Sequence, residues 1–307
     1  PIYHKFVELS RYLRPERSAF IIPTRWFAGG KPTLKEFRNT MLADRTLAVL
    51  HDFRDPSQVF PGTNNRGGVC YFILDTQRDT SKPPLIISHL DDGTEIKQER
   101  FLEHEGVDIF IRDSFALNAI ERLQHHQYAA LSEDISPLRP FGLRGYFVKS
   151  EQFRQTNEDL VDPIECIGKR NLRGYLERTE VPSCHDMIDI YKVFIPRANN
   201  IGTELSDDNL NAFVGLPGQI CTESYLVVHP IEDALDSAKK LRKYLQTKFV
   251  RFLHSAAKAG QDATSKTFVF VPSMASFDHH TLDWDCSTDE LDEQLFEIFG
   301  FPYELRS

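Results

Sequence analysis

Few side chains in this sequence have the types and spacing that metal chemistry requires. Glu95 and Lys97 stand two positions apart, a spacing with which metal-dependent nucleases hold a divalent cation and steady the attacking water. The nearest acidic residues, Asp91 and Asp92, fall in the same expected turn instead of on a preceding strand. We therefore interpret the segment as a solvated hairpin loop.

Other enzyme signatures also fail on inspection. Gly29-Gly30-Lys31 looks like the end of a phosphate-binding loop, but Arg25 stands where that loop needs a glycine and Pro32 displaces the hydroxyl residue. The sequence contains neither GxGxxG nor GxSxG, so it lacks the dinucleotide fingerprint and the nucleophile elbow. The histidine pairs at 125–126 and 279–280 lack ligand spacing. We predict no catalytic residue and no metal ligand.

The composition favours a folded protein of a reducing compartment. Of the 307 residues, 41% are hydrophobic and 11% aromatic, which suits one large domain or two ordinary ones. The five cysteines are odd in number and scattered, a pattern typical of reduced thiols. The apolar runs are too short to span a bilayer, and no basic-then-apolar leader opens the sequence. We expect a soluble, cytoplasmic protein without a membrane partner.

The charge is segregated along the chain. A formal net charge of −9 taken alone argues against a nucleic-acid partner. However, residues 239–258 contain seven basic residues and no acidic one, whereas residues 278–297 contain eight acidic residues and no lysine or arginine. A segregated chain can present a basic face while it stays acidic overall, so DNA binding stays open.

The first part of the chain has the pattern of an α/β layer. Residues 2–14 place four apolar side chains on one helical stripe, namely Ile2, Phe6, Leu9 and Leu13. A β-like run, a helical pattern and a second β-like run follow as far as Phe53. We predict antiparallel pairing for the apolar runs at 69–74 and 85–90.

The second part has an α+β pattern. A helix is predicted at 114–123, and the composition shifts at Ser136–Pro140, which we interpret as the domain boundary. Short apolar stretches then alternate with helical patterns at 232–254 and 288–299; the stretches include FGLRGYFV, YKVFIPRA, GQICTESYLVV and KTFVFVP. We thus predict an α/β part over residues 1–135 and an α+β part over residues 136–307.

One segment carries a resemblance to a known family. Residues 20–74 contain, in order, FIIPTRWFAGG, FRNTML and VFPGTNNRGGVCYFIL. This order resembles the part of an adenine-N6-specific DNA methyltransferase that lies downstream of its catalytic tetrapeptide, as found in type II (type IIG-like) restriction–modification proteins. The resemblance implies that residues 1–135 are the C-terminal half of a Rossmann-like methyltransferase domain.

The resemblance also implies one site residue. Adenine-N6 methylation requires that the base be flipped out of the duplex and stacked on apolar or aromatic side chains. Phe60, in the turn Val59-Phe60-Pro61-Gly62, matches the family's aromatic residue that packs against the flipped ring. The alternative is an ordinary core phenylalanine that closes a hairpin.

Two elements of that family are not found in the sequence. It has no Asn-Pro-Pro-Tyr-type tetrapeptide and no glycine-rich S-adenosylmethionine loop; in the family both precede the helix that begins here at Ile2. We therefore expect the chain alone to be inactive and to bind no cofactor, whereas the complete parent enzyme would use S-adenosylmethionine. The expected partner is the remainder of the methyltransferase, on the same polypeptide or on a separate subunit.

The second half resembles the target-recognition region of the same combined proteins. The matching segments are RPFGL (139–143), KVFIPR (192–197), GQICTESYLVV (218–228), YLQTKFVRFL (244–253) and ATSKTFVFVP (263–272). Double-stranded DNA is then the expected ligand, since arginine suits bidentate reading of guanine and lysine suits phosphate contact. The candidate DNA-binding residues are Arg139, Arg144, Lys192, Arg197, Lys240, Lys243, Arg251, Lys258 and Lys266.

Two other interpretations stay open at this point. The chain could be a stand-alone, non-catalytic DNA-specificity subunit that docks on a separate methylase, in which case an upstream gene would encode the missing motifs. It could instead be a degenerate protein or a protein-binding module, and failure to bind any DNA at low salt would favour that interpretation.

Overall fold

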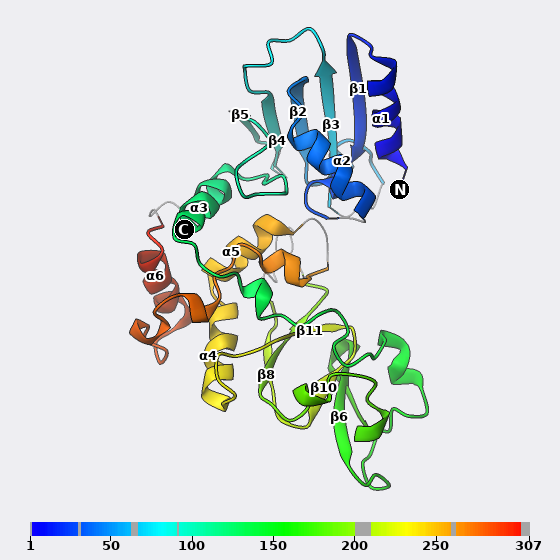
Figure 1. Ribbon diagram of the computed structural model, residues 1–307, viewed down its shortest axis with the longest axis vertical. Helices are drawn as coiled ribbons and strands as arrows, with labels where there is room; N and C mark the ends of the chain where they lie inside the picture. Colours follow the sequence, from blue (N-terminus) through cyan, green and yellow to red (C-terminus); the bar gives the residue numbers. More distant parts are fainter. Residues whose placement is uncertain are drawn as a thin grey trace. The chain divides into compact units, whose positions relative to one another are not determined.

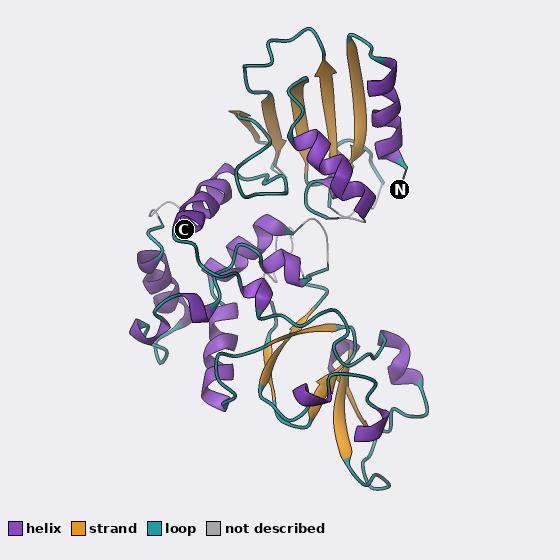
Figure 2. Ribbon diagram, in the orientation of Figure 1, coloured by secondary structure: helices purple, strands orange, loops and turns teal. Residues whose placement is uncertain are grey.

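The computed structural model describes residues 2–29, 32–62, 67–90, 92–199, 210–258 and 262–301. Within them the chain forms two compact units, one built mainly from residues up to Ser114 and the other from Phe115 onward (Figures 1 and 2). This division falls earlier in the sequence than the compositional boundary at Ser136–Pro140. The functional division at that boundary stays a prediction.

The N-terminal unit is built on a five-stranded sheet. Its strands are β1 (Arg17–Pro23), β2 (Leu47–Phe53), β3 (Val69–Asp75), β4 (Leu85–His89) and β5 (Glu95–Glu99), in spatial order β1-β3-β2-β4-β5. Strand β3 runs antiparallel to β1 and β2, β4 runs parallel to β2, and β5 runs antiparallel to β4. Strands β1 and β2 are therefore parallel to each other, with the reversed strand β3 between them.

Among the described residues of this unit, the α-helices are α1 (Tyr3–Leu13) and α2 (Pro32–Leu42). Both confirm the helical patterns of the sequence. Side chains on a strand alternate between its two faces, and both helices cover the face that carries Leu50 and Phe72. Val7 of α1 and Phe37 and Met41 of α2 share one buried core with those residues.

The antiparallel pairing predicted for residues 69–74 and 85–90 is wrong. Both runs are strands, but β2 lies between them and pairs with each. The segment that follows β3 is long enough to pass one strand, so β4 reaches the far edge of β2 and runs parallel to it. The hairpin expected near Asp92 is present as β4–β5, in which His89 faces Glu95.

The apolar stripe of α1 faces away from the core. Val7 is fully buried and His4 is 5% exposed, so these residues form the packed side of the helix. The stripe that the sequence pattern singles out is more than half exposed at every position, with Ile2 at 65%, Phe6 at 57%, Leu9 at 53% and Leu13 at 69%. The helix thus carries a second apolar face that this unit does not cover.

The C-terminal unit combines helices with two small sheets. Its helices are α3 (Ser114–His125), α4 (Leu235–Leu245), α5 (Lys248–Ala257) and α6 (Thr288–Ile298). One sheet has the order β10 (Gln219–Cys221), β6 (Pro163–Gly168), β7 (Leu172–Glu177), and the other has the order β11 (Tyr225–Val228), β8 (Lys192–Pro196), β9 (Phe213–Gly215). Side chains of both sheets share one core, in which Cys166 and Phe194 are fully buried.

The helical pattern at 232–254 is two helices instead of one. The side-chain hydroxyl of Thr247, in the break, accepts from the backbone N–H of Val250 (3.3 Å). The carboxylate of Asp292 accepts from the backbone N–H groups of Lys248 and Phe249, both at 2.8 Å. These bonds satisfy N–H groups that the first turn of a helix leaves without intrahelical partners, so a new helix starts at Lys248.

Two of the apolar stretches contain short 3₁₀ turns. In FGLRGYFV the turn covers Gly145–Lys149, and in KTFVFVP it covers Ser265–Phe268. At the second turn, Thr264 and Thr267 each bond the other's backbone through their side chains. Such local hydrogen bonds compete with strand pairing, which explains why hydrophobic runs alone do not identify strands here.

Candidate nucleic-acid interface

Phe60 lies in the loop that leaves the C-terminal end of β2. The loop begins with a turn at Pro56–Gln58, where the carboxylate of Asp55 accepts from the backbone N–H of Ser57 (2.9 Å). The backbone N–H of Phe60 then donates to the carbonyl of Pro56 (2.8 Å). The Phe60 residue is 44% exposed, so it is not a core phenylalanine, and its ring is available to stack on a planar group.

The other end of this loop is fixed at Gly67 and Gly68. The carbonyl of Gly67 accepts hydrogen bonds from the hydroxyl of Thr24 and from the guanidinium of Arg112, the latter at 2.7 Å. Gly68 has φ +94°, and a Cβ there would lie 2.2 Å from the carbonyl oxygen of Phe53. Only glycine fits such a position. The Phe60 loop is therefore held at both ends.

In the C-terminal unit, three of the predicted arginines gather around Glu223. Its carboxylate accepts from the backbone N–H of Gly145 (2.9 Å) and lies 3.8 Å from Nε of Arg139 and 4.0 Å from Nη1 of Arg144. Its carbonyl accepts from Nη1 of Arg197 (3.2 Å). The side chains of Arg139 and Arg144 are 40% and 53% exposed, so both remain accessible to a phosphate or a base edge.

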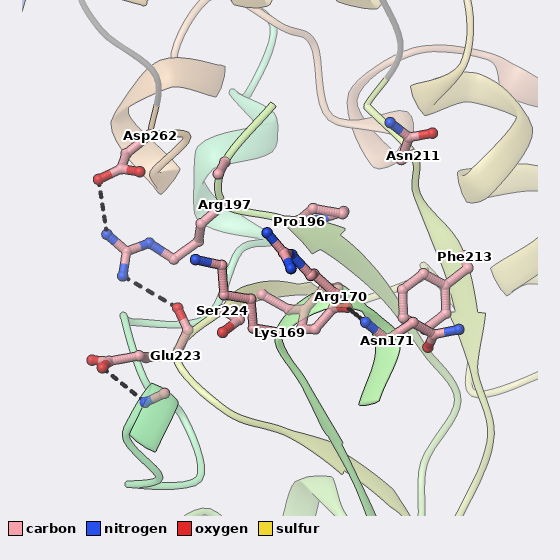
Figure 3. Close-up of a pocket in the computed structure, with 13 residues that line it drawn as sticks. Lys169, Arg170, Asn171, Pro196, Arg197, Asn211, Phe213, Glu223, Ser224 and Asp262 are labelled. Atoms are coloured by element: carbon pink, nitrogen blue, oxygen red, sulfur yellow. Dashed lines mark hydrogen bonds and ion pairs between the residues drawn. The ribbon is translucent and has the colours of Figure 1, made fainter. Parts of the chain in front are cut away.

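Arg197 lines a pocket of about 660 Å³ within this unit. Its Nη2 lies 3.6 Å from the carboxylate of Asp262, which lines the same pocket. Figure 3 shows the Arg197 side chain between Asp262 and the carbonyl of Glu223. Further walls come from the loop between β6 and β7, from β9 and from β11, through residues that include Lys169, Arg170, Asn171, Phe213, Ser224 and Tyr225.

Sequence reasoning missed the β6–β7 loop as a site. Lys169 and Arg170 are exposed and line the same pocket as Arg197. The available signal was the tetrapeptide Gly168-Lys169-Arg170-Asn171, in which residues that favour turns accompany two cations between apolar runs. The tetrapeptide becomes an exposed turn because β6 pairs with β7. The hydrophobic pattern alone does not predict that pairing.

Lys192 does not face solvent. It is fully buried, and its ammonium donates to the carbonyls of Ile188 (2.9 Å) and Gln219 (3.0 Å). Burial lowers the pKa of Lys192 to about 8, because the charged form loses its hydration. These contacts fix the start of β8, so we do not retain Lys192 among the candidate DNA contacts.

The lysines of α4 have partners within the protein. Lys240 forms an ion pair with Asp236 one turn earlier (2.7 Å), and its side chain is 35% exposed. The ammonium of Lys243 donates to the carbonyls of Trp284 (2.6 Å) and Cys286. Lys243 thus holds the segment before α6 against α4, whereas Lys240 remains the better placed of the two for contact with a phosphate.

The remaining predicted cations lie on or after α5 and do not line the pocket. Nε of Arg251 donates to the carbonyl of Thr247 (3.3 Å). Lys258 follows α5 and is half-buried, while Lys266 is exposed in the turn Ser265–Phe268. The structure thus gathers Arg139, Arg144 and Arg197 around Glu223. Arg251, Lys258 and Lys266 do not belong to that group.

The residues once considered for metal chemistry form a different arrangement. Lys97 and Glu95 lie on β5, with Nζ 3.2 Å from Oε2, and Asp91 lies outside the described residues. Among the described residues, no three histidine, cysteine or acidic side chains are grouped as metal ligands. In the same part of the chain, no helix combines the length and apolar character that crossing a membrane needs.

Comparison with known proteins places the N-terminal part of the chain. Residues 1–60 match the family model described as Eco57I restriction-modification methylase. An uncharacterized adenine-specific methylase of Mycoplasma pneumoniae is 29% identical over 72 residues, which are 24% of this chain and 17% of that protein. The chain therefore aligns with only a small share of this curated relative.

Two solved structures are similar over nearly the whole chain, at low identity. The type IIG restriction endonuclease BpuSI gives a TM-score of 0.33 at 13% identity, covering 96% of this chain and 44% of that one. The type IIL restriction-modification enzyme MmeI, solved in complex with DNA, gives 0.47 at 11% identity, covering 98% and 49%. The sequence similarity to the restriction-modification methylase family model covers residues 1–60.

Proposed function

We propose that this chain is part of an adenine-N6 DNA methyltransferase of a type IIG-like restriction–modification system. In this proposal, residues 1–135 supply the wall of the target-base pocket through Phe60, and residues 136–307 select the DNA sequence. The observation that carries it is the match of residues 1–60, a segment that includes Phe60, to restriction-modification methylases. The methyl donor of the complete enzyme is S-adenosylmethionine.

The sheet of the N-terminal unit supports an incomplete methyltransferase domain. Strand β1 stands at one end of the strand order and has β3 as its neighbour, and Ile21 on β1 is 53% exposed. An open edge strand presents unpaired backbone groups, and the helix beside it in sequence, α1, has the exposed apolar stripe. We assign this combined surface to the remainder of the methyltransferase.

The remainder of the methyltransferase could be joined to this chain in two ways, and both would cover the same surface. The remainder precedes this segment on the same polypeptide, or it is a separate methylase on which this chain docks as a specificity subunit. The exposed α1 stripe is compatible with both arrangements, since either one covers it. The reading frame upstream of Pro1 distinguishes the two arrangements. A continuous frame that encodes the tetrapeptide and the cofactor loop would contradict the separate subunit.

Transfer of a labelled methyl group tests the proposed activity. The complete gene product, or this chain mixed with its upstream methylase, is incubated with radiolabelled S-adenosylmethionine and mixed-sequence duplex DNA. We expect label in N6-methyladenine after nuclease digestion, and no label when the 307-residue chain is used alone. Label in 5-methylcytosine, or transfer by the isolated chain with contaminating methylases excluded, contradicts the proposal.

Substitutions on α1 test the partner surface. Phe6→Asp places a charge in the stripe and is expected to abolish transfer by the complete enzyme or its assembly with the separate methylase. Phe115→Asp is the matched control, because Phe115 is similarly exposed at 56% against 57% and lies on α3. Equal effects of the two variants would remove α1 from the proposed contact.

A further inference from the structure

Strands β6 and β7 are joined by an exposed cationic tip, residues 169–171. The two strands pair from Pro163↔Glu177 to Gly168↔Leu172, so residues 169–171 form the connection. Lys169 and Arg170 are exposed, and within the described residues neither side chain forms an ion pair or a hydrogen bond. The two cations of the tip are thus available to an external anion.

The tip has a defined conformation. Arg170 and Asn171 both have φ +59°, and the backbone N–H of Asn171 donates to the hydroxyl of Tyr225 (3.0 Å), a residue that is 4% exposed. At the base of the tip, a Cβ on Gly168 would lie 2.3 Å from Cγ1 of Val148. The tip is therefore packed against β11 and the turn that holds Val148, which limits the ordering cost of binding.

The surroundings of the tip are positively charged. Lys169, Arg170 and Arg197 line one pocket, and Arg139 and Arg144 flank Glu223 on its wall. Against these five cations stand two carboxylates, Glu223 and Asp262. A local excess of positive charge in a chain of net charge −9 points to an anionic ligand.

We propose that the tip between β6 and β7 lies against the major groove of duplex DNA, with Arg170 reading a base edge and Lys169 contacting a phosphate. Arginine reads guanine bidentately from that groove. The adjoining pocket, with Arg197 on its wall, receives the flanking sugar-phosphate strand. This inference rests on the proposed function, since it takes DNA as the ligand of the second half.

The test uses the 307-residue chain and a pool of duplexes with a randomised central segment at low salt. Arg170→Lys keeps the charge and removes the guanidinium fork, so it should bind mixed duplex like the wild type and relax the enriched base pattern at one position, by roughly 5- to 100-fold. Arg170→Asn suits the left-handed backbone of this position. It should lose both the affinity for mixed duplex and the base preference at that position. Lys169→Gln should weaken binding to all sequences alike and flatten the salt dependence.

Arg122→Gln provides the matched control. Arg122 lies on α3, is exposed and does not line the pocket, and it is expected to change neither the pattern nor the affinity. A wild-type base pattern for both Arg170 variants, in protein that melts like the wild type, overturns the assignment of the tip to a base edge and leaves the proposed function standing. A wild-type chain that binds no duplex, or that prefers an acidic peptide to DNA, overturns both.

Discussion

Arg112 and Asp52 form an ion pair inside the N-terminal unit, with Nε of Arg112 3.2 Å from Oδ2 of Asp52 and Asp52 only 1% exposed. Burial raises the pKa of the Asp52 carboxyl, and the guanidinium of Arg112 opposes that rise. Arg112 also lies 5.0 Å from the centre of the Phe27 ring and donates to the carbonyl of Gly67. The pair thus links the end of β2 to the loop that carries Phe60.

Removing one partner of this pair should destabilise the protein strongly. Arg112→Met leaves a buried carboxylate without its cation, which typically costs about 3–5 kcal/mol. Adding Asp52→Asn should recover much of that loss, because the buried charge is then removed. Urea denaturation of the 307-residue chain measures both. The control is Arg17→Met, which removes an exposed partner of Asp75 and should cost less than about 1 kcal/mol; equal losses at Arg17 and Arg112 contradict the assignment.

In the complete methyltransferase, Phe60→Ala should impair methyl transfer while duplex affinity stays largely intact. Stacking a base on an aromatic ring is worth roughly 1–3 kcal/mol, so the rate should fall between about fivefold and a hundredfold. The 44% exposure of Phe60 predicts that the fold tolerates the change, and thermal melting checks this. Phe115→Ala is the control for loss of an exposed phenylalanine, and a normal transfer rate in Phe60→Ala would remove this residue from the base pocket.

The secondary structure of the N-terminal unit could largely be predicted, but its strand order could not. Periodicity located α1, α2, β2 and β3 because each has its own apolar pattern. The neighbour of β4 depends on where the segment after β3 carries the chain, and no local pattern encodes that. The orientation of α1 could not be predicted either. The helix is where the pattern predicts it, but its apolar stripe is exposed, because an apolar pattern does not indicate which partner the stripe packs against.

The grouping of the candidate DNA-binding residues could be predicted only in part, for similar reasons, and their role stays a prediction. Arginine types and their loop positions singled out Arg139, Arg144 and Arg197, and the structure brings these three around Glu223. The sequence could not show that the Lys192 ammonium donates to a buried carbonyl, because a lysine can lie on a solvated surface or make a buried hydrogen bond. Such roles depend on tertiary neighbours.

Of the α4 lysines, Lys240 should contribute to DNA affinity and Lys243 to the stability of the fold. Lys240→Gln removes an exposed cation and should reduce duplex affinity for all sequences and flatten the salt slope by about one counterion. Lys243→Gln should instead lower the melting temperature, since its ammonium bonds the carbonyls of Trp284 and Cys286. Fluorescence anisotropy on mixed duplex and thermal melting measure the two effects. If Lys240→Gln binds DNA with unchanged affinity and salt slope, α4 does not contact the backbone.

Lys192 should make the stability of the chain depend on pH in the alkaline range. Burial lowers its pKa from 10.5 to about 8, so between these values the unfolded chain holds a proton that the folded chain has released. The free energy of unfolding therefore rises with pH through this window relative to a variant without the amine. Below about pH 8 both states are protonated, and the difference becomes constant.

Lys192→Met removes this amine, and the buried groups that Lys192 does not influence titrate alike in both proteins. We expect the stability of the wild type relative to Lys192→Met to increase by about 1–3 kcal/mol between pH 8 and pH 10.5, as measured by urea denaturation at a series of pH values. Lys149→Met is the control, since Lys149 is exposed and its removal should leave curves that run parallel to the wild type. A constant difference between wild type and Lys192→Met across that range would mean that the Lys192 ammonium keeps its proton inside the folded unit.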